Sequence, residues 1–224
     1  AKSRSIPHAI VIRKDTFGKY KLRQEALNDY PLSREEALMQ VVDHLGDNDI
    51  VVSTTGKLSR ELFEYRESKG QGHARDFLTV GSMGHSSSIA LGIALEKPDR
   101  RVYCLDGAFI MHMGAVSNIG DLSPKNYRHV LFNNGAHESV GGQPTLGFRL
   151  DIASIAKGCG YAHVLTASDK EGLSCALEKL SGLSGPVLLE IKVRIDSRDD
   201  LGRPTTTPVE NKEHFMAFLK DTHS

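Results

Sequence analysis

Tryptophan is absent from the 224-residue sequence, and cysteine occurs only three times. Cys104, Cys159 and Cys175 are widely spaced, and the sequence contains no Cys-x-x-Cys pair. Their odd number and their scatter argue against a disulfide framework, which small secreted domains use in place of a large core. We therefore expect the three cysteines to be small, buried apolar side chains in a protein of a reducing compartment.

The sequence also lacks an excess of charge of either sign, because 28 basic residues (Lys and Arg) balance 28 acidic residues (Asp and Glu). Without such an excess, no long-range attraction to a nucleic acid or to a charged membrane surface is expected. No apolar stretch is long enough to span a membrane, and the opening segment AKSRSIPHAIVIRK lacks the apolar centre of a signal peptide. We predict a cytoplasmic protein that binds neither nucleic acid nor membranes.

Beyond the first 30 residues, short apolar runs alternate with amphipathic segments. The runs typical of buried strands are residues 49–54, 76–80, 101–105, 128–132, 162–166 and 186–193. Segments with helical spacing are residues 32–46, 57–68, 87–97, 108–122, 151–160, 169–182 and 210–221. This alternation predicts an α/β fold with a doubly wound, mostly parallel sheet and helices on both faces. Residues 1–30 are interpreted as an extended arm or linker with one isolated strand at residues 9–14.

Four polar clusters directly follow apolar runs. They are STTGK at residues 53–57, GSMGH at 81–85, DGAF at 106–109 and NNGAHES at 133–139. Ligands of doubly wound sheets bind beyond the carboxyl ends of the strands. Because parallel strands end at the same edge of a sheet, we expect the four clusters to converge on one rim. This convergence is the main indication of function in the sequence.

Asp106 and Asn134 have the chemistry to bind a small, hard cation. Asp106 offers a carboxylate, Asn134 offers an amide carbonyl, and the loop after Asn134 offers a backbone carbonyl. Mg²⁺ prefers oxygen ligands and takes only some of them from protein, with phosphate and water completing its shell. Gly107 and Ala108 precede a predicted helix, whose unpaired first amides are a seat for phosphate. The alternative is that Asp106 only caps a helix and Asn134-Gly135 only forms a turn.

An Asp-Gly pair at one strand end, followed by Asn-Asn at the next, resembles the signature of the thiamine-diphosphate-dependent enzymes, in their diphosphate-binding (PP) domain. The family pattern begins Gly-Asp-Gly, whereas this sequence has Leu105 in place of the first glycine, which is not a ligand. The segment VGSMGHSSSIALGIAL resembles the strand end and small-residue helix that cradle the cofactor. The resemblance implies that the Gly81 carbonyl holds the cofactor's amino group and that Met83 is the apolar wedge that bends it. Ordinary core packing is the alternative for Met83.

Longer motifs narrow this resemblance. STTGKLSRELFEYR, DFLTVGSMGH and FNNGAHESVGGQPT together are similar to the phosphonopyruvate decarboxylases, with the sulfopyruvate decarboxylases as near relatives. The resemblance implies a PP domain over residues 31–224, with thiamine diphosphate and Mg²⁺ as cofactors. It implies that the metal ligands are Asp106, Asn134 and the backbone oxygen of Ala136. The cofactor-binding residues that it implies are Thr54, Thr55, Gly56, Lys57, Gly81, Ser82, Met83, Asp106, Gly107, Ala108 and Asn134.

Three histidines fall on or near the expected rim, namely His85, His112 and His137. For each one taken alone, a cap or a hydrogen bond to the backbone is the simpler interpretation. We favour His137 as the catalytic residue, because it directly follows the metal loop and could face the substrate phosphonate or transfer a proton. Glu138 is similarly placed, and its alternative role is to fix the loop.

No motif in the sequence supplies the carboxylate that these enzymes need at the pyrimidine ring of the cofactor. In the family, a glutamate of a separate pyrimidine-binding (Pyr) domain takes this role across a subunit interface. Only a short arm precedes the first predicted helix, so we interpret the chain as half of an active site. A Pyr domain or subunit is the expected partner, within a homo- or hetero-oligomer.

The resulting prediction is the PP half of a decarboxylase that converts phosphonopyruvate to phosphonoacetaldehyde and carbon dioxide, and that is inactive as an isolated chain. The first alternative is a sulfopyruvate decarboxylase β subunit, since no residue assigns the difference between a phosphonate and a sulfonate. The second alternative comes from another class of protein: a nucleotide-binding or interaction module without catalysis.

Overall fold

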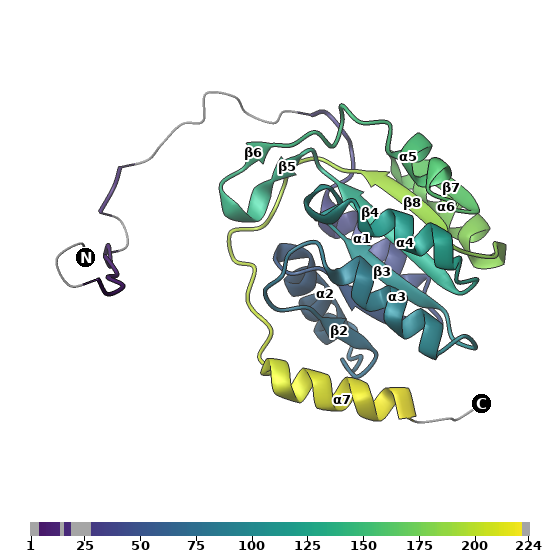
Figure 1. The fold of residues 1–224 in the computed structure, drawn as a ribbon, viewed down its shortest axis with the longest axis horizontal. Coiled ribbons are helices and arrows are strands. Elements are labelled where there is room, and N and C mark those ends of the chain that lie inside the picture. The colour runs from purple at the N-terminus through teal and green to yellow at the C-terminus, as the bar shows by residue number, and fades with distance from the viewer. Residues whose placement is uncertain (1–4, 14–15, 19–27, 221–224) are drawn as a thin grey trace.

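The computed structural model of the chain describes residues 5–13, 16–18 and 28–220. At its centre lies a six-stranded sheet with the strand order β2-β1-β3-β4-β8-β7, in which every neighbouring pair is parallel. The strands are β1 (Ile50–Ser53), β2 (Asp76–Leu78), β3 (Val102–Asp106), β4 (Tyr127–Asn133), β7 (His163–Ala167) and β8 (Val187–Lys192). Helices cover both faces of the sheet (Figure 1). The predicted doubly wound α/β fold is therefore confirmed.

The helices divide between the two faces of the sheet. They are α1 (Arg34–Asp43), α2 (Lys57–Ser68), α3 (Ser86–Glu96), α4 (Ala115–Leu122), α5 (Ile152–Gly158), α6 (Lys170–Gly182) and α7 (Pro208–Lys220). One apolar core lies between the sheet and α1, α2 and α6, and a second lies between the sheet and α3, α4, α5 and α7. Successive residues of a strand point to opposite faces, so on β3 Tyr103 and Leu105 enter the first core while Val102 and Cys104 enter the second.

The order of the strands creates a topological switch point between β1 and β3. From β1 the chain crosses to β2 on one side and then returns to β3 on the other side of β1. The connections that follow β1 and β3 therefore diverge toward opposite sides of the sheet. Doubly wound proteins bind their ligands in the crevice that such a divergence leaves at the carboxyl ends of the strands.

The helix that we expected over residues 108–122 is interrupted. A short 3-10 turn, η1 (Phe109–His112), comes first, and α4 begins only at Ala115. Gly114 lies at this break, and glycine is a poor helix former because it loses more backbone freedom than other residues. The prediction of one continuous helix was wrong, and the break separates the Asp106–Ala108 turn from the helix that follows.

A small hairpin between β4 and α5 was not predicted. It consists of β5 (Ala136–His137), the 3-10 turn η2 (Glu138–Val140) and β6 (Gln143–Pro144), with the two strands antiparallel. The NNGAHES segment runs from the end of β4 into this hairpin. The hairpin was missed because strands of two residues have no detectable periodicity.

Two other expectations need correction. The isolated strand expected at residues 9–14 does not form in the described residues 9–13, and residue 14 lies outside the described part of the chain. Of the three cysteines only Cys104 is buried, whereas Cys159 is intermediate and Cys175 is exposed on α6.

Within the described residues, no helix is both long and apolar enough to cross a lipid bilayer.

Candidate functional site

Two adjoining cavities lie at the carboxyl ends of β1, β3 and β4. Both are lined by Gly107 and Ala108 after β3, and by Asn134, Ala136 and His137 after β4. The second cavity adds residues from the end of β1, the start of α2 and the segment before α3, namely Thr54, Thr55, Lys57 and Met83. Segments far apart in the sequence thus form one wall, as the convergence of strand ends predicted.

Four of the residues proposed for cofactor binding do not line these cavities. Gly81 and Ser82 are exposed beside the second cavity, and Gly56 lies between the lining residues Thr55 and Lys57. Asp106 is 1% exposed and lies behind the Gly107-Ala108 turn. The structure therefore brings most of the proposed residues to one place but sets Asp106 one layer deeper.

The start of α2 is suited to bind an anion. The helix has no side-chain cap on its first amides among the described residues, and its N-cap is Gly56, with φ of 119°. The hydroxyl of Thr54 is buried and has no hydrogen-bond partner in the described part of the chain. The positive φ at position 56 favours glycine, whereas an added Cβ would make only ordinary contacts, 3.4 Å from Met83 Cε and 3.6 Å from Ser139 Oγ. Unpaired amides and a free hydroxyl are hydrogen-bond donors for phosphate oxygens.

Thr55 fixes the loop that carries the GSMGH cluster. Its hydroxyl lies 2.9 Å from the carbonyl oxygen of Thr79 and 2.5 Å from that of Gly81. The loop after β2 is thereby held against the end of β1, and half-buried Met83 is brought to the wall of the second cavity. The Gly81 carbonyl, proposed to hold an amino group, already accepts one hydrogen bond and keeps one lone pair for another.

Both carboxylate oxygens of Asp106 have partners inside the protein. The backbone amide of Ala108 donates to Oδ1 at 2.7 Å, and the ring nitrogen Nε2 of His129 lies 3.0 Å from Oδ2. The helix cap that we considered as the alternative role of Asp106 is not observed, because η1 and α4 have Ala108 and Gly114 as their N-caps, and the contact with Ala108 closes only a local turn. Each carboxylate oxygen has two lone pairs, so the two hydrogen bonds leave capacity for a cation.

The loop after β4 is fixed by its own side chains. The amide of Ala136 donates to Asn134 Oδ1 at 3.0 Å, while Asn134 Nδ2 donates to Glu138 Oε2 at 2.8 Å. Glu138 also accepts from Arg34 at 2.5 Å. These contacts confine the Asn134 amide to one orientation, with its oxygen directed to the Ala136 end of the loop. The loop-fixing role considered for Glu138 is what the geometry shows.

Arg34 on α1 is a component of the site that no motif or spacing in the sequence indicates. It is 6% exposed and forms a paired contact with Glu61 of α2, through Nε to Oε2 at 2.8 Å and NH2 to Oε1 at 2.6 Å. Burial raises the pKa of the Glu61 carboxyl despite this partner. Burial also tends to raise the pKa of Glu138, but Arg34 and Lys57 outweigh it and hold that pKa below its ordinary value. Glu138 is therefore an anion at neutral pH.

Of the three histidines near the rim, only His137 lines the cavities. His85 and His112 instead contact each other, with ring centroids 3.9 Å apart, and His85 Nδ1 lies 3.1 Å from the Ser82 carbonyl oxygen. The simpler interpretation, a hydrogen bond to the backbone, applies to His85, whereas His112 contacts the His85 ring.

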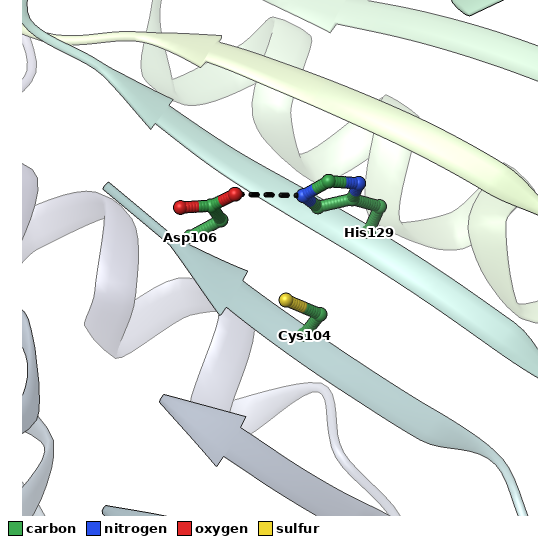
Figure 2. Close-up of side chains that lie close together, drawn as sticks. All are labelled: Cys104, Asp106 and His129. Carbon is green, nitrogen blue, oxygen red and sulfur yellow. Dashed lines mark hydrogen bonds and ion pairs between the residues drawn. The ribbon is translucent and has the colours of Figure 1, made fainter. Parts of the chain in front are cut away.

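His129, for which the sequence suggested no role, is fully buried beside Asp106, beneath the cavity wall. Figure 2 shows it on β4 facing Asp106, with Cys104 beside the pair on β3. The parallel register that pairs Cys104 with His129 brings the three residues together. A histidine within an apolar strand, RHVLF, is a usable signal, because a fully buried ring needs a polar partner.

Comparison with known proteins identifies the family. The model of the thiamine pyrophosphate enzyme C-terminal TPP binding domain matches residues 54–191. The phosphonopyruvate decarboxylase of Streptomyces viridochromogenes is 37% identical over 189 residues, which cover 84% of this chain and 46% of the relative. The sulfopyruvate decarboxylase subunit beta of Methanocaldococcus jannaschii is 38% identical over 144 residues, which cover 63% of this chain and 73% of the relative.

Solved structures agree at the level of the fold. The benzoylformate decarboxylase of Polynucleobacter necessarius superposes with a TM-score of 0.61 at 18% identity, over 77% of this chain and 35% of that one. The chain spans about half the length of the two phosphonopyruvate decarboxylases that it matches, 46% and 47%. The matched residues include the segments that directly follow β1, β3 and β4 and line the cavities. By sequence match and by fold, the chain belongs to the thiamine pyrophosphate enzymes and contains their C-terminal TPP binding domain.

Proposed function

We propose that this chain forms the diphosphate- and magnesium-binding half of a decarboxylase that converts phosphonopyruvate to phosphonoacetaldehyde and carbon dioxide. The observation that carries the proposal is the shared wall after β1, β3 and β4, where Thr54, Gly107 and Asn134 meet. The resemblance in sequence to two phosphonopyruvate decarboxylases supports this choice of substrate.

The residues at the start of α2 fit the diphosphate group of thiamine diphosphate. The buried Thr54 hydroxyl lacks a partner among the described residues, and in that part of the chain no side chain caps the first amides of α2. Lys57 adds a positive charge whose Nζ lies 3.4 Å from Glu138. Gly107 and Ala108 line the same cavity, where the Ala108 amide already donates to Asp106 and the Gly107 amide is the donor proposed for phosphate. Together they offer donors and a cation to a group that is rich in negative oxygens.

For the metal, we propose Asp106, Asn134 and the backbone oxygen of Ala136 as ligands. All three offer oxygen, which suits Mg²⁺ and not a softer metal. Asn134 and Ala136 line both cavities, and Asp106 lies directly beneath Gly107. The proposal requires that the remaining lone pairs of these oxygens face a common point near the diphosphate.

Bound thiamine diphosphate supplies the electron sink for loss of carbon dioxide from a 2-keto acid. The chain's own residues bind and orient the reacting groups. We propose that the Gly81 carbonyl accepts a hydrogen bond from the cofactor's amino group and that Met83 supports its bend. His137, on the wall of both cavities, would face the substrate phosphonate or move a proton.

We further propose that a Pyr domain, on another chain or on another part of a longer one, completes the site. Among the described residues lining the two cavities, Glu138 is the only carboxylate. It is held by Arg34, Asn134 and Lys57, so it is not free to meet a pyrimidine nitrogen. The relatives named as β subunits favour a sulfopyruvate decarboxylase with two kinds of chain as the second candidate.

Thermal unfolding in the presence of ligands tests the proposal. Thiamine diphosphate with Mg²⁺ should raise the melting temperature, because a ligand that binds only the folded state stabilises it. ATP and NAD, each with Mg²⁺, serve as controls for a nucleotide-binding module. Asp106→Ala and Asn134→Leu should each abolish the magnesium-dependent part of the shift. Equal shifts in the parent and both variants would show that the metal site is misassigned.

A further inference from the structure

His129 is a polar side chain at the centre of an otherwise apolar layer. Its side chain is fully buried, and its ring contacts a polar group on each side. Nε2 lies 3.0 Å from Asp106 Oδ2, and Nδ1 lies 2.9 Å from the hydroxyl oxygen of Tyr161. Leaving a buried polar group unpaired destabilises the folded state, so each group in this series of three residues needs its hydrogen-bond partner.

The chemistry of the partners sets the direction of these hydrogen bonds. An ionised carboxylate only accepts, so the ring donates to Asp106 from Nε2. In a neutral ring Nδ1 is then the acceptor, and the Tyr161 hydroxyl donates to it. Burial, together with the neighbouring Cys104 and Asp106, raises the pKa of Tyr161, so its hydroxyl keeps the proton that it donates. The series therefore runs Tyr161 to His129 to Asp106.

Because Cys104 lies beside Asp106 and His129, the three residues have to be considered as a possible metal site. One ligand atom each of Cys104, Asp106 and His129 lies within 4.8 Å of the others, which is the spacing of a metal centre (Figure 2). However, both ring nitrogens of His129 already have partners. The Cys104 thiol also has a partner, since it donates to Ser86 Oγ at 3.7 Å within the apolar core. The cluster is a hydrogen-bonded support and not a second metal site.

We infer that His129 and Tyr161 are positioning residues, which hold the Asp106 carboxylate in the orientation that binds Mg²⁺. The inference rests on the metal role proposed for Asp106. Ala108 fixes one carboxylate oxygen and His129 fixes the other, so the plane of the group cannot rotate. Partners that orient a metal ligand in this way typically contribute 10- to 100-fold to metal affinity.

Mn²⁺ in the presence of thiamine diphosphate is a suitable probe, because its binding can be followed by electron paramagnetic resonance without any turnover. His129→Leu should raise the Kd of Mn²⁺ by about 10- to 100-fold. His129→Gln keeps a donor within reach of Asp106 and should recover part of that loss. Tyr161→Phe should raise the Kd of Mn²⁺ by a smaller factor. The His129 imidazole stays in place in this variant but loses the hydrogen bond that fixes its orientation.

Two control variants separate positioning from general stability. Val130→Ala removes a fully buried side chain of the same strand that enters the opposite core, so it lowers the melting temperature without touching Asp106. Tyr103→Phe removes a buried hydroxyl that has no partner among the described residues. Neither control should change the Kd of Mn²⁺. Equal weakening in Val130→Ala and His129→Leu would overturn the inference.

The outcomes also separate this inference from the proposed function. If Asp106→Ala loses Mn²⁺ binding while His129→Leu binds as the parent does, only the positioning role fails. If Asp106→Ala binds as the parent does, the metal role of Asp106 fails, and the positioning role falls with it. A nitrogen NMR spectrum that finds the His129 proton on Nδ1 instead of Nε2 would also contradict the inference.

Discussion

At the scale of single residues, the candidate site combines side chains held by hydrogen bonds with a side chain that has no hydrogen-bond partner among the described residues. The carboxylate of Asp106 and the amide of Asn134 are each held by two partners. The Thr54 hydroxyl, by contrast, has no partner among the described residues. Fixed groups suit a metal, which demands a defined geometry, whereas a free donor suits a phosphate oxygen that completes its hydrogen bonding.

Met83 permits a prediction at this scale. In an enzyme reconstituted with a Pyr domain, Met83→Ala should leave thiamine diphosphate affinity nearly unchanged, because diphosphate and metal dominate binding. Turnover should fall by about 10- to 100-fold, since a small misplacement of reacting groups is costly. Titration calorimetry and carbon dioxide release measure the two effects.

The matched control for Met83 is Met111, which lines both cavities and has no proposed contact with the bend. Met111→Ala should lower turnover much less than Met83→Ala does. Similar losses in the two variants would indicate that both methionines only pack against the cofactor.

At the scale of elements, α4 packs closely against the end of α5. A Cβ added at Gly120 of α4 would lie 1.6 Å from the carbonyl oxygen of Cys159, which follows α5. No flexible side chain is available to move, because the obstructing atom belongs to the backbone. α4 can therefore approach the end of α5 only with glycine at this position.

Gly120→Ala should consequently lower the free energy of unfolding by about 1–3 kcal/mol, the range for an overpacked core. Gly92 on α3 is the matched control, since an added Cβ would meet nothing within 4 Å. Gly92→Ala should be neutral or stabilise by up to about 1 kcal/mol, because alanine favours the helix. Urea unfolding of both variants measures the difference, and equal stabilities would contradict the packing argument.

At the scale of the whole molecule, the six-stranded sheet places the ends of β1, β3 and β4 on one edge. Under the proposed function, this edge provides donors for a diphosphate and oxygens for a metal. Its one cavity-lining carboxylate in the described residues, Glu138, is already engaged. We therefore propose that the edge holds one end of thiamine diphosphate and that a Pyr domain supplies the surface and the carboxylate for the pyrimidine end.

The isolated 224-residue chain should therefore release no carbon dioxide from phosphonopyruvate at a useful rate, even with thiamine diphosphate and Mg²⁺ present. Adding a matching Pyr domain should restore activity, since acid–base help of this kind contributes on the order of 100- to 10,000-fold. A Pyr domain whose pyrimidine-facing glutamate is replaced by glutamine is the control and should not restore it. Fast turnover by the chain alone would refute the half-site proposal.

The sequence by itself determined the layers of the fold and the edge at which the site lies. Apolar runs such as residues 101–105 and 128–132 predict buried parallel strands, because a strand covered on both faces needs apolar side chains throughout. The polar groups after those runs, including Asp106 and Asn134, then have to emerge at one edge. This information is local in the chain, so it can be read without coordinates, as can the family motifs that the comparisons confirm.

Only the tertiary structure decided which groups support those residues. The contact of His129 with Asp106 depends on the register between β3 and β4, and a shift of one residue would turn the ring to the other face. The contact of Arg34 with Glu138 joins α1 to a hairpin that no periodicity predicted. Such contacts join residues distant in the chain, and their energies depend on burial, which arises only when the layers pack.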